Sequence, residues 1–454
     1  MSPSYHCAQR CINPAMTAPA KYLSLQHNYA EPVIDQLTGF PAGFHQGLVI
    51  PVYQEGIEVL TRFAEFAGQH SGTLIILIIN RPDTDNPDND TEWAKPFLAA
   101  NSLAALNWQS ADQLLSLHPL ANNSGLLLVD RCLYGAPLPI DQGVGLARKI
   151  GADILCALIH QQKVSSPWIS NSDADATLPS DYFASIERAG NSSKAIAAII
   201  HPYKHIFHDQ TPVLPTLLYE FSLHYYVAGL HWAGSPYAYQ TLGSTITVNY
   251  QHYAMVRGFP KRAGAEDFYL LNKLAKTGAI HSLQQPLIRL QARESTRVPF
   301  GTGPAVINLG AQQQPLSMPL YHPECFRYLQ FFLHLLTAIA NQPDELAAIA
   351  KREATANIDL TIILALADSL KLQSAINHCA KQGKNATTRL QHLQHWFDGF
   401  KTLKSIHWLR EHHFASISFQ QWRLQQPDSY QFSNNEAMTQ LIQRIDSLDQ
   451  RDTQ

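Results

Sequence analysis

The chain has 454 residues, of which 45% are hydrophobic and 15% charged, and its formal net charge is −3. A chain of this length exceeds the usual size of one domain, and a slightly acidic chain without a basic run has no general attraction for nucleic acid. No apolar run reaches the 18 residues of a membrane span, and the N-terminus has no signal-peptide pattern, so we expect a cytoplasmic protein without a transmembrane segment.

Residues 1–44 contain prolines and polar residues with little periodicity, and we treat them as an N-terminal extension. Strand and helix patterns then alternate. Strands are predicted at Gly47–Tyr53, Thr73–Ile79, Gly125–Val129 and Ser166–Ser172, and helices at Glu55–Gln69 and Gly143–Ile159. Strands that are apolar throughout are typical of a mainly parallel sheet covered on both faces, and ligands of such sheets bind beyond the carboxyl ends of the strands. We therefore expect an α/β domain over residues 45–300.

The rest of the chain has a helical pattern. Helical stretches are predicted at Phe326–Ala340, Asp344–Ala354, Asp359–Leu370 and Thr387–Leu409, which indicates an all-helical C-terminal region over 321–454. Residues 301–320 would be a linker or a lid, because arginines precede a Gly-Thr-Gly turn there and could clamp phosphate. Aromatic and basic residues mixed near Trp396 leave open a peripheral position at the inner face of the membrane.

Two aspartates follow the fourth predicted strand. Asp173 and Asp175 are separated by one small residue, and Pro179 ends the segment. Alternate side chains of an extended backbone lie on the same side, so both carboxylates can converge on one point. Such oxygens suit Mg²⁺ or Mn²⁺, which keep other positions for water and phosphate. The pair predicts a metal-assisted diphosphate site; a solvated acidic turn is the alternative.

A second acidic pair, Glu266 and Asp267, begins a helical pattern after Arg257-Gly258-Phe259-Pro260. A carboxylate in the first turn is favoured by the helix dipole, and from there Asp267 could take a proton from an attacking hydroxyl. Helix capping alone would also explain the pair. Two acidic pairs at element ends of one α/β chain favour a functional site.

Four motifs, in this order, resemble those of the GT-A-fold glycosyltransferases of the inverting family 2. The first is the turn Ile50-Pro51-Val52-Tyr53-Gln54-Glu55. The second is the helix start Gly143-Val144-Gly145-Leu146-Ala147-Arg148-Lys149-Ile150-Gly151. The third runs from Asp173 to Phe183, and the fourth is Arg257-Gly258-Phe259 before Glu266-Asp267. The resemblance covers residues from about 46 to about 290 and none of the helical tail.

This resemblance implies a metal-dependent enzyme of the hexosyltransferase type that uses a nucleotide-sugar donor. Asp175 would hold the divalent metal, with Asp173 contacting the metal through water or the ribose. Asp267 would be the base that deprotonates the acceptor hydroxyl, with Glu266 beside it. At Lys149 the chain departs from the asparagine of the family pattern.

The resemblance also implies a nucleoside pocket. Pro51, Tyr53 and Glu55 would line this pocket, and Arg148 would reach the base or the phosphates. The second strand of the family usually ends in an acidic Asp-Asp-Gly-Ser-like turn, whereas here it ends Asn80-Arg81-Pro82-Asp83-Thr84-Asp85. We take Asp83 as the base-binding acid.

Other functions stay open at this stage. A retaining transferase of the same fold would share the aspartate pair but would not need Asp267 as base. A non-catalytic nucleotide-sugar-binding protein is a further alternative, although carboxylates that repel one another have no value without a ligand. A nucleotidyltransferase and a dinucleotide dehydrogenase are disfavoured, because both need glycine-rich loops that this chain lacks. The sequence does not indicate the acceptor, which would be a saccharide, a lipid-linked molecule or a small molecule, nor the oligomeric state.

Overall fold

The computed structural model describes residues 17–24, 30–86, 91–98, 106–191, 195–207, 213–297, 301–341, 346–383, 385–425 and 436–452. The chain divides into two compact units, each made from two stretches of sequence. Residues 1–202 and 241–288 form the first unit, and residues 203–240 and 289–454 form the second. This division differs from the predicted one, because residues 203–240 and 289–300 belong with the C-terminal helices.

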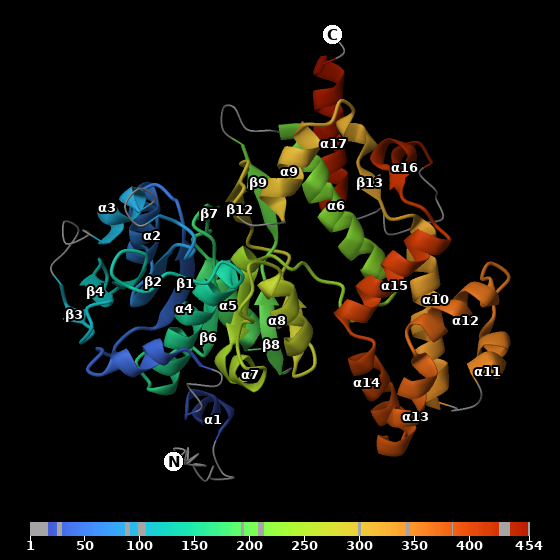
Figure 1. Cartoon of the computed structure of the whole chain (residues 1–454), viewed down its shortest axis with the longest axis horizontal. Coiled ribbons are helices and arrows are strands. Elements are labelled where there is room, and N and C mark those ends of the chain that lie inside the picture. Colours follow the sequence, from blue (N-terminus) through green and yellow to red (C-terminus); the bar gives the residue numbers. More distant parts are fainter. Residues whose placement is uncertain are drawn as a thin grey trace, which may run out of the picture. The chain divides into compact units, whose positions relative to one another are not determined.

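A nine-stranded sheet forms the centre of the first unit (Figure 1). Its strand order is β11-β8-β10-β6-β1-β2-β5-β4-β3. The bounds are β1 Gln46–Val52, β2 Thr73–Asn80, β3 Trp108–Gln109, β4 Leu115–Pro119, β5 Gly125–Arg131, β6 Trp168–Asn171, β8 Ile196–Ile200, β10 Ile246–Asn249 and β11 Ala279–Ser282. Strands β6, β1, β2 and β5 are parallel neighbours, whereas β10 is antiparallel to β6 and β4 to β5. The α/β class with a mostly parallel sheet is confirmed.

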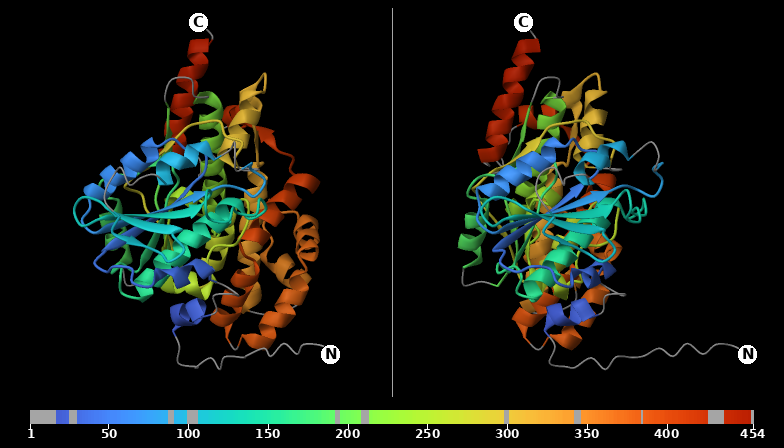
Figure 2. Two further views of the ribbon diagram at one scale, coloured as in Figure 1. Left: turned by 60° about the vertical axis from the view of Figure 1, so that its left-hand side comes forward. Right: turned by 90° about the vertical axis from the view of Figure 1, so that its left-hand side faces the viewer.

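Helices cover the sheet on both faces, as the apolar strands predict. Every residue of β2 is buried. Helix α2 (Glu58–Gly68) and helix α4 (Gly143–His160) lie on opposite faces of the strands (Figure 2). Gly151 lets α4 approach closely, since a Cβ atom there would lie 2.4 Å from Val49 and 2.6 Å from Ile78.

The remaining elements of the first unit are short. They are α1 Ala18–Ser24, η1 Pro32–Leu37, η2 Glu92–Ala94, α3 Lys95–Leu98, β7 Ala176–Thr177, α5 Tyr182–Gly190, η4 Gly243–Thr245, α7 Tyr250–Met255 and α8 Glu266–Leu274. The described part of the predicted N-terminal extension belongs to this fold, because Tyr22, Ile34, Leu37 and Phe40 are buried. It is therefore not a loose tail.

The order of the strands places a switch point at β1. From β1 the chain runs through α2 to β2 on one side, whereas from β5 it runs through α4 to β6 on the other side. In open α/β sheets ligands bind beyond the carboxyl ends of the strands at such a switch point, here those of β1 and β6. The turn at Tyr53 follows β1, and the aspartate pair follows β6.

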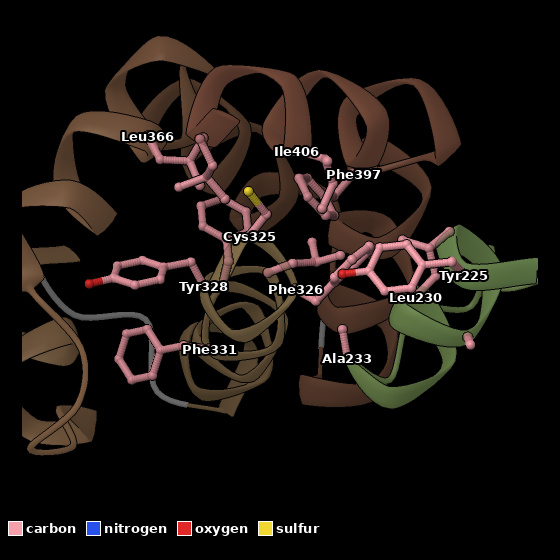
Figure 3. Close-up of a cluster of buried hydrophobic side chains, with 14 of the residues drawn as sticks. Tyr225, Leu230, Ala233, Cys325, Phe326, Tyr328, Phe331, Leu366, Phe397 and Ile406 are labelled. Carbon is pink, nitrogen blue, oxygen red and sulfur yellow. The ribbon is translucent and has the colours of Figure 1, made fainter. Parts of the chain in front are cut away.

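The second unit is mainly helical. Its elements are β9 Tyr203–Ile206, α6 Val213–Trp232, β12 Ile288–Gln291, α9 Thr302–Gly310, η5 Pro315–Ser317, β13 Pro319–Leu320, α10 Pro323–Asn341, α11 Leu346–Glu353, α12 Leu360–Ser369, α13 Leu372–Gln382, α14 Ala386–Trp396, α15 Gly399–His412, β14 Ile417–Ser418, α16 Phe419–Gln425 and α17 Glu436–Asp452. Figure 3 shows part of its core, where Tyr225 of α6, Phe326 of α10 and Phe397 lie together. None of the helices described in either unit is both long enough and apolar enough to cross a membrane.

Three predictions for the C-terminal half need correction. Residues 301–320, predicted as a linker or a lid between two domains, contain helix α9 and belong to the second unit. The region beyond 320 is not purely helical, because β14 pairs with β13 in an antiparallel ladder. The predicted stretch Thr387–Leu409 is two helices, and Asp398 caps the second by accepting a hydrogen bond from the Lys401 amide at 3.2 Å.

Candidate functional site

The turn with the aspartate pair lies at the carboxyl end of β6, as predicted. Its start is fixed to the neighbouring strand, because the Ser172 amide donates to the Val49 carbonyl at 3.0 Å. Ala174 is buried, while the side chains of Asp173 and Asp175 on either side are partly exposed. The Ser172 hydroxyl is buried and has no hydrogen-bond partner among the described residues. An unpaired buried polar atom beside two carboxylates indicates a place for water or a ligand.

Arg148 of α4 joins the two acidic pairs. Its Nε donates to Glu266 Oε1 at 2.8 Å, and its Nη2 donates to Asp173 Oδ1. A third hydrogen bond runs from Nη1 to the Ser172 carbonyl at 3.2 Å. The Arg148 and Glu266 side chains are 3% and 5% exposed, so the guanidinium is enclosed by its partners. The end of β6 and the start of α8 are thereby held against the same side chain.

Small residues make room for this arrangement. A Cβ atom on Gly243 would lie 2.4 Å from the guanidinium of Arg148. At the start of α4, a Cβ on Gly145 would lie 2.5 Å from the Arg262 carbonyl, to which the Gly145 amide donates at 3.0 Å. The glycines of the helix-start motif therefore let α4 pack against the backbone that leads to Glu266.

Asp267 is the second residue of α8. It is half-buried, and its Oδ1 accepts a hydrogen bond from the Phe268 amide at 2.7 Å. Burial first, and then the charge of the adjacent Glu266, raise the pKa of the Asp267 carboxyl to about 8. A carboxyl group with a raised pKa is a stronger base when ionised, which suits proton abstraction near neutral pH.

The charge of Arg148 is itself secured by its partners. Burial alone lowers the pKa of the guanidinium, but the negative charges of Asp173 and Glu266 outweigh this effect and raise it. A permanently charged, planar donor set of this kind matches two carboxylates at once.

A second cluster follows β1 and β2. The Tyr53 hydroxyl donates to Asp85 Oδ2 at 3.0 Å, and the Tyr53 ring meets Trp93 edge-on with centroids 6.1 Å apart. Asp83, predicted to bind the base, is exposed, and its Oδ1 accepts the Ile140 amide at 3.1 Å. The structure therefore joins Tyr53 to Asp85 rather than to Asp83. Because only Thr84 separates Asp83 from Asp85, the sequence alone does not decide which of the two contacts Tyr53.

The two other residues predicted to line the nucleoside pocket, Pro51 and Glu55, lie within two positions of Tyr53 in the sequence. Pro51 is within β1, where it pairs with Ile78 and is half-buried, and Glu55 is half-buried in the turn before α2. Because β1 lies between β6 and β2, these positions lie at the end of the sheet that carries the aspartate turn.

Arg62 is a site residue that the sequence did not reveal. It lies on α2, and its Nη2 donates to the carbonyl of Ala174, the residue between the two aspartates. Arg148 and Arg62 thus contact the turn from two different helices. In the sequence, Arg62 is only a basic residue on the partly polar face of a predicted helix. Such residues are common in solvated helices, so nothing local marks Arg62 as part of a site.

The acidic residues of the site outnumber its arginines. The four carboxylates are Asp173, Asp175, Glu266 and Asp267. Within the described part of the chain, no three His, Cys, Asp or Glu side chains are grouped to hold a metal. The site therefore fits a divalent cation only if a substrate supplies part of its ligands, as Mg²⁺ commonly requires.

Comparisons with known proteins do not add a family. A scan against protein-family models gave no match, and a search of curated proteins gave no significant match.

Proposed function

We propose that the chain is a metal-dependent glycosyltransferase with a GT-A-type first unit. It would move a sugar from a nucleotide-diphosphate donor to an acceptor hydroxyl with inversion. The observation that supports this most is Arg148, which ties the Asp173 turn at the switch point to the start of α8, where Asp267 lies. The proposed metal ligands and the proposed base come from distant parts of the sequence and would thereby act at one site.

The two acidic pairs would have separate roles. A Mg²⁺ or Mn²⁺ ion bound by Asp175, with Asp173 nearby, would neutralise charge on the leaving diphosphate. Asp267 would accept the proton of the acceptor hydroxyl as that oxygen attacks the anomeric carbon from the face opposite the leaving group. The raised pKa of Asp267 supports this role and favours inversion over a retaining mechanism.

Arg148 is reassigned in this proposal. It is nearly fully buried and engaged by Asp173 and Glu266, so we propose that it positions these carboxylates rather than contacting the donor. Tyr53 and Asp85, next to Pro51 and Glu55, would form the nucleoside end of the site.

Calorimetry with UDP-sugars and GDP-sugars tests the donor site. We expect binding that requires Mn²⁺ and is lost in Asp175→Ala. Asp181→Ala is the matched control, because Asp181 is an exposed aspartate in the same region that pairs with Arg188. Asp267→Asn should keep donor binding and lose transfer by a factor of about 10² or more.

Two outcomes would contradict the proposal. The first is that the folded wild-type protein, with metal present, binds no nucleotide sugar. Alternatively, Asp267→Asn would transfer sugar at the wild-type rate, and the base would then be another group.

A further inference from the structure

A second buried polar cluster lies on α4, one turn beyond Arg148. Its centre is the Asp153 carboxylate, which is fully buried. Oδ1 accepts hydrogen bonds from the hydroxyls of Tyr22 and Tyr253, both at 2.7 Å, and Oδ2 accepts the Glu31 amide at 2.8 Å. Lys149 Nζ lies 3.1 Å from Oδ2 and supplies the opposite charge. The carboxylate is thus satisfied by four partners, as a buried charge requires.

Two of these four partners come from the beginning of the chain. We name residues 18–24 and 30–40 the N-terminal strap. Its Tyr22 donates to Asp153 and accepts from Lys149, whose ammonium lies 5.1 Å from the centre of the Tyr22 ring. Lys149 is the position where the chain departs from the asparagine of the glycosyltransferase pattern. That lysine pairs with Asp153 on the same helix and also donates to the Tyr22 hydroxyl of the strap.

The strap also contacts the segment before Asp267. Gly258 has φ 70°, and a Cβ atom there would lie 2.7 Å from the hydroxyls of both Tyr22 and Tyr253. Glu31 Oε1 forms an ion pair with Lys261 Nζ at 2.6 Å. The strap therefore lies against the backbone of residues 258–261.

Residues 257–267 are consequently held at several points. The Gly258 turn lies against the Asp153 cluster, Lys261 pairs with Glu31, and the Arg262 carbonyl accepts from the start of α4. Glu266 then pairs with Arg148. The strap takes part in the first two of these contacts, together with Tyr253 in the first, and α4 takes part in the last two.

We propose that the N-terminal strap positions Asp267, through Tyr22 and the Glu31–Lys261 pair, and so sets the rate of proton transfer. This rests on the proposed function of Asp267 as base. The strap does not contact the turn of Asp173 and Asp175 through any of these interactions, so donor affinity is independent of it.

The test uses the full chain with Tyr22→Phe and Lys261→Ala, and measures transfer kinetics and amide hydrogen exchange. We expect kcat to fall about tenfold or more with the donor KM unchanged, because small displacements of a reacting group have large effects. Exchange over residues 257–267 should accelerate in both variants. Lys261→Arg keeps the ion pair and should restore both readouts. Lys261 is 46% exposed, so its variants are expected to fold even where Tyr22→Phe does not.

Tyr225→Phe is the matched control. It removes a buried tyrosine hydroxyl in the second unit that donates to the Tyr321 carbonyl at 2.7 Å. An equal loss of kcat in this control would overturn the proposal, since general destabilisation would then explain the effect. Unchanged exchange over 257–267 in both strap variants would also overturn it. Faster exchange in a protein whose wild type transfers no sugar would support the positioning contacts and contradict only the proposed function.

Discussion

Arg148 and Glu266 are 118 positions apart in the sequence, yet their side chains form a buried ion pair with Nε 2.8 Å from Oε1. Neither charge has access to bulk water that could replace the other. The pair therefore fixes the start of α8 to α4, and with it the position of Asp267.

The first prediction concerns the stability of this pair. Arg148→Met leaves the Glu266 carboxylate buried without its cation, so we expect the free energy of unfolding to fall by about 3–5 kcal/mol. Urea unfolding, with hydrogen exchange of α4 reporting on the first unit, measures the loss. Arg148→Met combined with Glu266→Gln should recover part of it.

Arg188→Met is the comparison for this loss. Arg188 forms an exposed pair with Asp181 at 3.7 Å, so its removal should change the free energy of unfolding by less than about 1 kcal/mol. A loss as small as this for Arg148→Met would show that the buried pair does not stabilise the unit.

The second prediction concerns pH. The pKa of Asp267 is higher in the folded protein than in the unfolded chain, so between about pH 4 and pH 8 the folded state binds more protons. The contribution of the Asp267 carboxyl to the free energy of unfolding is fully present below about pH 4 and is lost as the pH rises through about 8. Asp267→Asn should therefore stabilise the protein by about 1–2 kcal/mol at pH 9, after allowance for partial exposure, and by nothing near pH 4.

Thermal unfolding of the wild type and Asp267→Asn across this pH range measures the difference. In parallel, the transfer rate of the wild type should rise with pH through about 8, because only the ionised carboxylate accepts a proton. A constant stability difference between the two proteins from pH 4 to pH 9 would contradict the raised pKa.

The third prediction separates two neighbouring aspartates and rests on the proposed donor site. Asp85→Asn should weaken nucleotide binding about tenfold or more, because the Asp85 carboxylate is half-buried and accepts the Tyr53 hydroxyl beyond the carboxyl end of β1. Asp83→Asn should leave the affinity unchanged, since Asp83 is exposed and already accepts the Ile140 amide. Calorimetric titration with UDP and GDP compares them. The reverse order of effects would restore Asp83 as the base-binding residue.

The sequence predicted those parts of the fold whose signals are local. Strand β2 is an unbroken apolar run, and α4 begins at a glycine motif, so both were found within a residue or two of their bounds. Glu266 and Asp267 were correctly expected in the first turn of a helix.

The remaining features depend on contacts that a local pattern does not carry. Helix α6 is apolar on nearly all sides and lies between two strands in the sequence, so nothing local assigned it to the second unit. The bond between Tyr22 and Asp153 joins residues 131 positions apart. The start of α15 differs, because Asp398 is a residue type favoured at helix N-caps, so this boundary is recognisable from the sequence.

The interrupted sequence of the first unit has a consequence for synthesis. Strand β10 lies between β6 and β8 in the sheet, but it comes after the excursion of residues 203–240. A nascent chain on the ribosome therefore leaves β6 and β8 without their shared neighbour until about residue 250 has emerged, and unpaired strand edges can pair with other chains. Asp267 emerges only later still, and the edge strand β11 follows it, so protein synthesis supplies the last carboxylate of the site before the last strand of the sheet.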